Sequence, residues 1–425
     1  MKMCRSGGNH KLCISIRAAG QPALQPSITI SPTTVPNFQG CCAVSTVVIS
    51  PPANQADKLD LAEFVYRFGQ QPDSWLATGP GRTAFWSEGR RGLVSYTVRG
   101  GFAMVGGGLI CPPDEQQQLL LQFLSFCKSR KWRPVFFFIP EDHITLFRNQ
   151  GWFTSKVGED TLLDTADLAF TGPEYEWVRR QSSYCRRHGV TVREVRQQDF
   201  TETEWCHLLR QLSDVCASSM RARAQQAELK FLDGSLDDHE LGHRRLFLAE
   251  TQSSAGARIE GYVVCNPIRG GQAWSTEIYR HRQDSVRGTV PFLIHQIVLK
   301  LKQEGVREVS LCLAPGQNCE QHVPNERPLV RKLILLFRDH GAAFFDMRGI
   351  CYFKSRFRPR CENLYLCSPP NTDLFPLIST ARAFFAIAGV LGLLQVSPLT
   401  LLKIWFRRRS KTPRAVSAEP SAGGC

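Results

Sequence analysis

Apolar and polar positions recur in one fixed order through the middle of the chain. Two short apolar runs around a glycine pair predict a hairpin, and a glycine turn, a helical pattern, an intensely apolar run and a second helical pattern follow. The predicted order is strand, strand, turn, helix, strand and helix. These elements fall at residues 93–98, 102–105, 106–108, 114–130, 135–139 and 141–149.

The same order returns in the second half of the chain. Three runs predict strands, Arg287 and Gly288 then open a helix, and one more strand and helix follow. The predicted positions are 246–250, 261–266, 273–279, 289–303, 307–313 and 328–339. We therefore predict an α/β (α+β) protein built from a tandem duplicated GNAT-like acyltransferase fold, in which hairpin strands lead to a phosphate-binding turn at a helix N-terminus.

Composition divides the chain into four segments. Residues 1–57 are basic, rich in Ser, Thr, Pro and Gly, and free of acidic residues before Asp57, which predicts a disordered leader or an organellar targeting segment. We expect a first GNAT-like unit over 58–200 and a second unit, with the catalytic motifs, over 201–370. Residues 371–425 would form a linker, an apolar membrane segment and a basic tail.

The apolar segment, 383–402, is an uncharged stretch of twenty residues between Arg382 and Lys403. As a helix it would be about 30 Å long, enough to cross a bilayer. Pro398 interrupts it and arginines follow it, so a position in the membrane interface is the other interpretation. We expect a membrane-associated protein whose catalytic units lie on the cytoplasmic side.

Charge and cysteine usage narrow the partners. Lys and Arg outnumber Asp and Glu by 52 to 38, a formal charge of +14, which favours nucleic acid or an anionic membrane. The 16 cysteines are scattered without zinc-ligand spacing, so we expect free thiols and no metal site. A predicted helix over 175–189 carries four arginines that suit tRNA or another phosphate, unless they form a solvated face. They are Arg179, Arg180, Arg186 and Arg187.

Three stretches resemble the motifs of one family. The first joins Gly151-Trp152-Phe153 to Lys156-Val157-Gly158-Glu159, and the second joins Glu277-Ile278-Tyr279-Arg280 to Gly288 and Leu311–Pro315. The third and most specific is Phe353–Leu366, which reads FKSRFRPRCENLYL. Over about residues 75–367 the chain resembles the C-terminal catalytic domain of phosphatidylglycerol lysyltransferases, the multiple peptide resistance factors.

The resemblance implies a transfer of an aminoacyl group from aminoacyl-tRNA, the donor substrate, to a lipid hydroxyl, commonly that of phosphatidylglycerol. It implies no metal or redox cofactor, and no stable protein partner is inferred. Two positions depart from the family's motifs, because Glu277 replaces an aspartate and Cys361 replaces a tryptophan. The amino acid and the lipid acceptor therefore stay open.

Such a transfer needs cations for phosphate, a partner for the substrate ammonium and help in deprotonating a hydroxyl. The resemblance favours Glu277, Arg280 and Lys354 as catalytic residues, and an ion pair at a strand end is the alternative for the first two. Residues three apart on a regular strand face opposite ways, so Glu277 and Arg280 can share a cleft only if the strand ends or bulges between them. Arg287 and Gly288, at a helix start, suit a substrate phosphate or oxyanion.

Cations occupy every second position from residue 354 to residue 360. This spacing predicts one basic face of an extended strand, which suits substrate phosphate, with protection of a sheet edge as the alternative. The cations are Lys354, Arg356, Arg358 and Arg360. We expect the Gly106–Gly108 turn to be structural.

Three functions remain open on the sequence. The motifs favour a tRNA-dependent aminoacyl-lipid transferase. A GNAT-type acyltransferase with an acyl-CoA donor would normally have a turn richer in glycine than the one that ends at Gly288. A non-catalytic membrane-associated binding protein would need only the basic face.

Overall fold

A computed structural model describes residues 55–370 with the exception of 222–240, 254–255 and 344. Most of the predicted leader and the whole apolar segment 383–402 therefore lie outside the described residues. Within the described ranges, none of the helices combines the length and the apolar character needed to cross a membrane.

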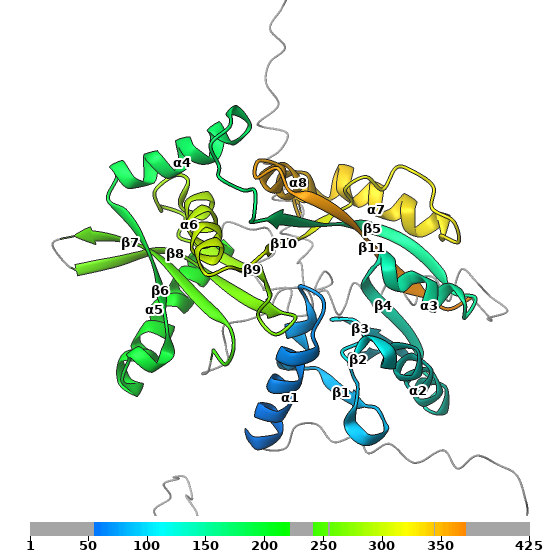
Figure 1. The fold of residues 1–425 in the computed structure, drawn as a ribbon. Coiled ribbons are helices and arrows are strands. Elements are labelled where there is room, and N and C mark those ends of the chain that lie inside the picture. The colour runs from blue at the N-terminus through cyan, green and yellow to red at the C-terminus, as the bar shows by residue number, and fades with distance from the viewer. Residues whose placement is uncertain (1–54, 222–240, 254–255, 344, 371–425) are drawn as a thin grey trace, which may run out of the picture. The chain divides into compact units, whose positions relative to one another are not determined.

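The described strands form one mixed sheet (Figure 1). Their order across it is β1-β2-β3-β4-β11-β5-β10-β9-β8-β7-β6. The strands are β1 (Thr83–Trp86), β2 (Leu93–Arg99), β3 (Phe102–Val105), β4 (Arg133–Pro140), β5 (Phe153–Asp164), β6 (Val190–Val195), β7 (Arg245–Ser253), β8 (Gly256–Ile268), β9 (Ala273–His281), β10 (Glu308–Pro315) and β11 (Arg360–Ser368). The α-helices are α1 (Gln55–Phe68), α2 (Gln116–Ser129), α3 (Ile144–Arg148), α4 (Glu176–Arg187), α5 (Glu202–Arg221), α6 (Thr289–Gln303), α7 (Pro328–His340) and α8 (Met347–Ser355).

The two ends of the sheet repeat one pattern of pairing. At one end β2 pairs antiparallel with β3, and β3 runs parallel to β4. At the other end β8 pairs antiparallel with β9, and β9 runs parallel to β10. A parallel pair needs a crossover connection, which contains α2 in the first half and α6 in the second. The repeated apolar pattern of the sequence reflects this repeated pairing.

The two central strands are exchanged between the halves. β5 follows β4 along the chain but pairs with β10, whereas β11 follows β10 but pairs with β4. β5 and β11 also pair with each other. The predicted boundary at residue 200 stays a prediction, and β6, which precedes it, pairs with β7 of the second half. Strand β11 thus lies next to the strands of the first half, while β5 and β6 lie with the strands of the second.

A bulge follows each parallel pair. β3 and β4 pair up to Phe136, after which two residues of β4 oppose a single residue of β11. β9 and β10 pair up to Ser310, after which two residues of β10 oppose a single residue of β5. The second bulged residue has a positive φ in both cases, 59° at Phe138 and 64° at Cys312. Bulges bend a strand and redirect its side chains, and the second of these lies at the candidate site.

Helices cover both faces of the second half of the sheet. Phe247 and Val263 pack in an apolar cluster with side chains of α4 and α6, whereas Leu246 and Val264 pack in another with α5. Successive residues of a strand face opposite sides, so α6 and α5 lie on opposite faces. In the first half, side chains of α2 and α3 pack around Phe136.

Candidate active site

A bulge in β9 brings Glu277 and Arg280 to the same face of the sheet. Arg280 lies opposite Tyr262 of β8, and Ser275 lies opposite Asn266, yet β9 has one residue more than β8 between these two pairs. Tyr262 and Asn266 share a face of β8, and Asn266 Nδ2 donates a hydrogen bond to Glu277 Oε2. Glu277 and Arg280 therefore meet the geometric condition for lining one site.

Arg82, from the first half, acts on Glu277, and Asp73 in turn acts on Arg82. Burial lowers the pKa of Arg82 to about 10, against the opposing effect of the negative charges of Asp73 and Glu277. Burial raises the pKa of Asp73 to about 6, although the Gly107 N–H, 2.9 Å from Oδ2, and the charge of Arg82 both lower it. Arg82 is thus half-buried and interacts with two carboxyl groups. Sequence reasoning missed Asp73, Arg82 and Asn266 because none belongs to a motif and the first two are distant from Glu277 in the chain.

The Gly106–Gly108 turn supports this arrangement. A side chain at Gly106 would bring a Cβ within 3.0 Å of Arg82 Nη1, so the guanidinium lies directly against the backbone there. Ser74 Oγ donates to the carbonyl oxygen of Gly107 at 3.1 Å. The turn is thus filled by neighbouring protein groups.

A second polar group lies at the β10 bulge. Ser310 Oγ donates to Asp160 Oδ1 at 2.6 Å and accepts from the backbone N–H of Cys312 at 2.8 Å. Burial raises the pKa of Asp160 to about 6, while the Ser310 hydrogen bond and the charge of Lys354 lower it. Lys354 Nζ donates to the carbonyl oxygen of Leu313 at 2.7 Å. The Asp160 carboxyl group, the Ser310 hydroxyl and the Lys354 ammonium thus come together from β5, β10 and α8.

Glu277 connects the two groups of side chains. Burial raises the pKa of the Cys312 thiol, and the charges that act on this thiol include those of Lys354, Asp160 and Glu277. Glu277 also acts on Arg82. We call the combined set the central polar site. Its members are Asp73, Arg82, Asp160, Asn266, Glu277, Arg280, Ser310 and Lys354.

The first family motif contributes a buried ion pair nearby. Lys156 Nζ lies 2.6 Å from Glu159 Oε1, and Asn318 Nδ2 donates to the same carboxylate at 3.0 Å. Burial, and next the charge of Glu159, raise the pKa of Cys361 to about 11. Cys361, which replaces the tryptophan of the family's motif, thus lies within the electrostatic reach of this ion pair.

The predicted basic strand from Lys354 to Arg360 is wrong. Helix α8 continues to Ser355, and β11 begins only at Arg360. Phe353 and Phe357, four residues apart, both pack in the second-half cluster and follow the helical period. Alternating charge gave the appearance of a strand, whereas the apolar spacing decided the structure.

The cations of this segment consequently separate. Lys354 is buried beside β10, whereas the guanidinium of Arg356 lies over the ring of Trp177 at 5.5 Å from its centroid. Arg358 is exposed in the turn, with a φ of 56°. Arg360 Nη2 forms an ion pair with Glu308 Oε2 at 2.9 Å. These positions do not form one basic face, and only Lys354 reaches the central polar site.

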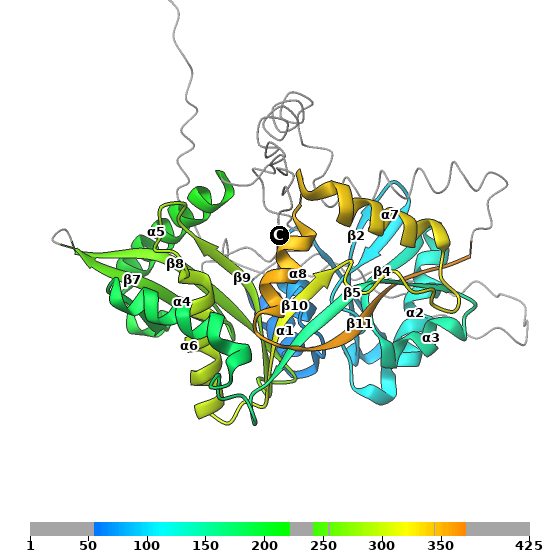
Figure 2. The ribbon, with the colours of Figure 1, turned by 90° about the horizontal axis from the view of Figure 1, so that it is seen from above.

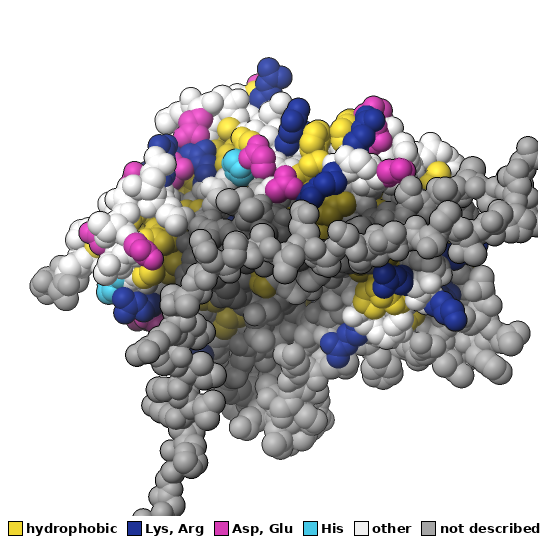
Figure 3. All heavy atoms as spheres, turned by 90° about the horizontal axis from the view of Figure 1, so that it is seen from below, with side chains coloured by type: hydrophobic (Ala, Val, Ile, Leu, Met, Phe, Trp, Pro, Cys, Tyr) yellow, Lys and Arg dark blue, Asp and Glu magenta, His cyan; other side chains and the backbone are white. Residues whose placement is uncertain are grey.

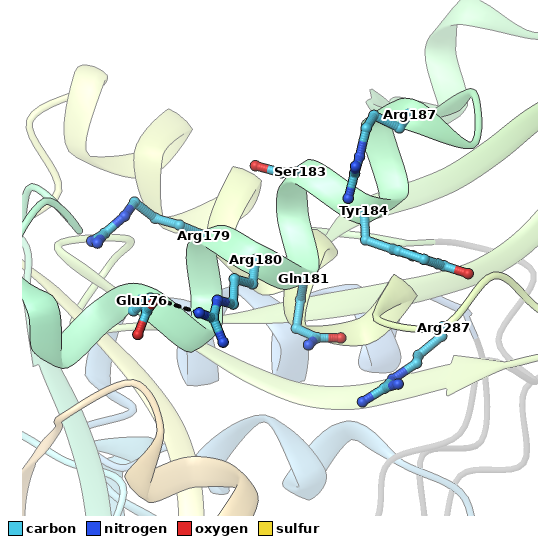
Figure 4. Close-up of a pocket in the computed structure, with 8 residues that line it drawn as sticks. All are labelled: Glu176, Arg179, Arg180, Gln181, Ser183, Tyr184, Arg187 and Arg287. Carbon is cyan, nitrogen blue, oxygen red and sulfur yellow. Dashed lines mark ion pairs between the residues drawn. The ribbon is translucent and has the colours of Figure 1, made fainter.

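A separate pocket of about 600 Å³ lies beside α4 (Figure 4). Arg180 and Gln181 point toward the side on which Arg287 lies. Of the four predicted arginines of α4, Arg186 alone does not line the pocket, since its guanidinium lies over the Phe292 ring at 5.4 Å. The lining residues are Glu176, Arg179, Arg180, Gln181, Ser183, Tyr184, Arg187 and Arg287.

Helix α4 covers the turn that opens α6. Gly288 has a φ of 89°, and a Cβ at this position would lie 2.7 Å from Gln181 Oε1. Cys185 Sγ donates to the carbonyl oxygen of Arg287 at 3.4 Å. Pro291 removes one backbone donor from the first turn of α6. Arg287 itself is exposed and lines the pocket, so it is more accessible to an anion than Gly288 is.

The functional groups of the central polar site are carboxylates, guanidinium groups, a lysine ammonium, an amide and a hydroxyl. Among the residues that the structure describes, no three His, Cys, Asp or Glu side chains gather closely enough to hold a metal ion. The described cysteines are free thiols. The chemistry of the central polar site is therefore derived from its charged side chains and from Ser310.

Comparison with known proteins decides the family. Residues 62–368 match the family described as phosphatidylglycerol lysyltransferase, C-terminal. This range exceeds half of the 425 residues. The chain belongs to this family. The resemblance that the motifs indicated over about residues 75–367 is confirmed.

Relatives of this family are longer proteins. The chain is 23% identical over 353 residues to the lysylphosphatidylglycerol biosynthesis bifunctional protein LysX of Gordonia bronchialis, and the match covers 81% of this chain but 30% of that protein. It is also 23% identical to an MprF-like domain protein of Mycobacterium tuberculosis, with coverage of 56% of this chain and 49% of that protein. The chain thus spans less than half the length of either relative.

A solved structure shares the fold. The structure of L-PGS from Bacillus licheniformis superposes with a TM-score of 0.64 at 17% identity, and the match covers 81% of this chain and 97% of that chain. At this identity the likeness establishes the mixed α/β fold.

Proposed function

We propose that this protein transfers an aminoacyl group from aminoacyl-tRNA to a hydroxyl group of a membrane lipid. The observation that carries the proposal is the position of Glu277, which shares a face with Arg280 and whose charge acts both on Arg82 and on Cys312 at the β10 bulge, where Ser310 bonds Asp160. Family membership over residues 62–368 supports this chemistry. We further infer that the fold is a tandem GNAT-like duplication, with one parallel strand pair in each copy and the exchange of β5 and β11 joining the copies.

The proposed reaction is a transesterification. The lipid oxygen forms a new ester bond to the aminoacyl carbon, the bond to the ribose oxygen of the tRNA breaks, and the proton of the lipid hydroxyl passes to the leaving ribose oxygen. Asp160, with a pKa raised to about 6 by burial, is matched to accept and return this proton near neutral pH. Glu277 would hold the ammonium group, while Arg280 and Lys354 would stabilise the oxyanion of the tetrahedral intermediate.

The pocket beside α4 supports the assignment of an RNA donor. Arg180, Arg187 and Arg287 line it and can neutralise phosphates. Tyr184, at its edge, stacks on His188 with ring centroids 4.0 Å apart, and both side chains are exposed. Exposed aromatic rings beside arginines suit unstacked bases at an RNA end. We propose that this pocket holds phosphates near the acceptor end of the tRNA.

The acceptor and the location follow from the same proposal. A lipid hydroxyl is presented at a membrane surface, so the protein would be membrane-associated, and its donor would place the catalytic halves on the cytoplasmic side. Phosphatidylglycerol is the acceptor that the family's name supports. Glu277 and Cys361, the two departures from the family's motifs, are the positions through which a different amino acid or acceptor would be selected.

The acyl-CoA alternative fits the structure less well. A diphosphate would need the backbone donors at the start of α6, where Gln181 lies over Gly288 and Pro291 lacks an N–H. A non-catalytic binding protein would not need a buried carboxyl group whose pKa lies near neutrality, as that of Asp160 does.

One experiment separates the three functions. Purified protein receives isotope-labelled aminoacyl-tRNA or labelled acetyl-CoA, together with phosphatidylglycerol vesicles. We expect labelled lipid from aminoacyl-tRNA alone, and its formation should stop after RNase treatment. Label that appears only from acetyl-CoA would establish the second function, and the absence of label from both donors would leave the binding protein.

A further inference from the structure

Helix α7 presents its apolar side chains to solvent. Leu329, Leu333 and Leu336 are 46%, 36% and 57% exposed. Their spacing, with Lys332 between them, places all four residues on one face of the helix. Val330, on another face, packs against an apolar cluster of the first half. A surface helix normally turns polar residues to the solvent, so this outer face is unusual for a helix that water alone would cover.

The exposed apolar residues are concentrated in this part of the molecule. Seven large hydrophobic side chains are exposed among the described residues, and four of them belong to α7 and α8, the fourth being Tyr352 at 63%. These two helices contact each other and lie beside β5 and β10 (Figure 2). By contrast, the face seen from below shows hydrophobic side chains interspersed with charges of both signs (Figure 3). A concentrated apolar patch marks an interaction surface.

The charge around this patch has a small positive surplus. Between residues 328 and 356 the sequence contains six Lys and Arg residues and two Asp residues, but Lys354 is buried, Arg331 pairs with Glu326 and Arg338 pairs with Glu320. Arg338 and Arg348 share Asp339, with distances of 2.9 Å from each to Oδ1. Lys332, on the leucine face, has no ion pair with any other described residue. Leucines next to surplus cations match the chemistry of an anionic bilayer surface, which offers acyl chains beneath negative headgroups.

The patch is connected to the central polar site through one strand end. Lys354 of α8 bonds the carbonyl oxygen of Leu313, and Arg338 Nη1 of α7 donates to the carbonyl oxygen of Gly316 at 3.2 Å. Leu313 lies in β10 directly after the bulge that follows Ser310, and Gly316 follows the last residue of that strand, Pro315. A bilayer bound to α7 would therefore lie close to the proposed reaction.

We propose that the outer face of α7, together with Tyr352 of α8, docks on an anionic phospholipid bilayer. This inference rests on the proposed function for its lipid acceptor, but it concerns a surface that transfer chemistry alone would not require. The three leucines insert between headgroups, and Lys332 contacts lipid phosphate.

Hydrogen exchange of the full chain, followed by mass spectrometry, tests the surface directly. Amides of residues 328–340 should exchange more slowly when vesicles of phosphatidylglycerol and phosphatidylcholine are added, and vesicles of phosphatidylcholine alone should have a much weaker effect. Amides of α2, residues 116–129, serve as the internal control because Leu121 is exposed by 44% on a helix without a leucine stripe.

A matched pair of variants gives the second measurement. Leu333→Glu/Leu336→Glu should weaken binding to the mixed vesicles about tenfold or more, since two inserted leucines are lost. Leu121→Glu places one such charge on a leucine whose exposure, 44%, lies between those of Leu333 and Leu336, and it should bind like the unaltered protein. Equal vesicle binding by all three proteins, or unchanged exchange of residues 328–340, would overturn the docking surface and leave the segment 383–402 as the membrane contact.

Turnover on a short-chain, fully dispersed phosphatidylglycerol separates this proposal from the proposed function. Leu333→Glu/Leu336→Glu should retain most turnover on the dispersed lipid and lose about tenfold on vesicles. If the unaltered protein protects residues 328–340 on vesicles but transfers to neither lipid, the docking surface stands and the transferase function fails. If transfer to vesicles is undiminished in the double variant, the transferase stands and the docking surface fails.

Discussion

The two bulges that follow the parallel strand pairs have the same backbone form and opposite contents. In the first half, Phe137 and Phe138 pack with Leu366 and Val157 in an apolar cluster. In the second half, the charges of Lys354, Asp160 and Glu277 act on Cys312, and Ser310 Oγ accepts from its backbone N–H. The repeated pairing therefore provides two similar places in the sheet, and among the described residues the second bulge has titratable side chains beside it.

The first half still contributes to the chemistry of the second. Its glycine turn is filled by Ser74 and by the carboxyl group of Asp73, and Arg82 beside it acts on Glu277. The turn that opens α6 in the second half lies instead beside a pocket lined by arginines. The first half thus supplies Arg82, whose charge acts on Glu277 of the second half.

The largest effect on turnover is expected from removing the negative charge of Glu277. Glu277→Gln should lower turnover about a hundredfold or more, because the amide keeps the shape but no longer balances a substrate ammonium or Arg82. Steady-state transfer from labelled aminoacyl-tRNA measures the loss.

Glu250→Gln is the matched control for this change. Glu250 is a buried carboxylate of the second half that pairs with Arg193, 2.7 Å away, on strands outside the central polar site. Its loss should lower the melting temperature and leave turnover per folded molecule near normal. Equal loss of turnover in both variants would show that Glu277 only holds the sheet together.

A somewhat smaller effect is expected at Lys354. Lys354→Met keeps the length of the buried side chain and removes its charge, so turnover should fall by about one to two orders of magnitude if the ammonium stabilises an oxyanion. Lys302→Met is the control, since Lys302 Nζ of α6 also donates to backbone carbonyl oxygens, at 2.9 and 3.0 Å, but these belong to Ala166 and Leu168, outside the central polar site. Near-normal turnover in Lys354→Met would assign this lysine to α8 packing alone.

Sequence patterns predicted the elements of the two parallel pairs well, because their apolar runs and crossover helices have strong periods. The exchange of β5 and β11 could not be predicted, since pairing between distant strands leaves no local pattern. The motif at Glu277 predicted Glu277 and Arg280, two of the eight residues of the central polar site. Asp73 and Arg82 reach it from loops around β1, where only the folded chain reveals their proximity. The strand predicted from Lys354 to Arg360 was wrong because the charges of this segment alternate, whereas its phenylalanines follow a helical period.

The pH dependence of stability compares one carboxyl group from each half. Burial raises the pKa values of Asp160 and Asp73 from 3.8 to about 6. The folded protein therefore binds more protons than the unfolded chain between about pH 4 and pH 6, and the free energy of unfolding should fall as pH rises through this window. Each carboxyl group contributes up to roughly 3 kcal/mol to that fall. Asp160→Asn and Asp73→Asn should each flatten the slope in chemical unfolding measured from pH 4 to pH 7.

Turnover should distinguish the same two variants. The unaltered protein should lose activity as pH falls through about 6, because protonated Asp160 cannot accept the hydroxyl proton. Asp160→Asn should abolish this fall of activity at low pH and lower the maximal turnover. Asp73→Asn should keep the fall of activity at low pH. A fall that disappears only in Asp73→Asn would move the proton acceptor to the first half and reverse the assignment of the two bulges.

The smallest effect concerns the turns rather than the bulges. If the arginine-lined pocket beside α6 binds tRNA phosphates, Arg187→Ala should weaken tRNA binding only a few-fold, because one of several phosphate contacts is lost. The dependence of log affinity on log salt should become shallower by about one. Arg99→Ala removes an exposed arginine next to the hairpin of the first half and serves as the control, with no change in slope expected. Because the glycine turn of the first half is filled by protein groups, phosphate binding there is disfavoured, and a salt slope that responds to Arg99 but not to Arg187 would mean that the RNA binds along the first half after all.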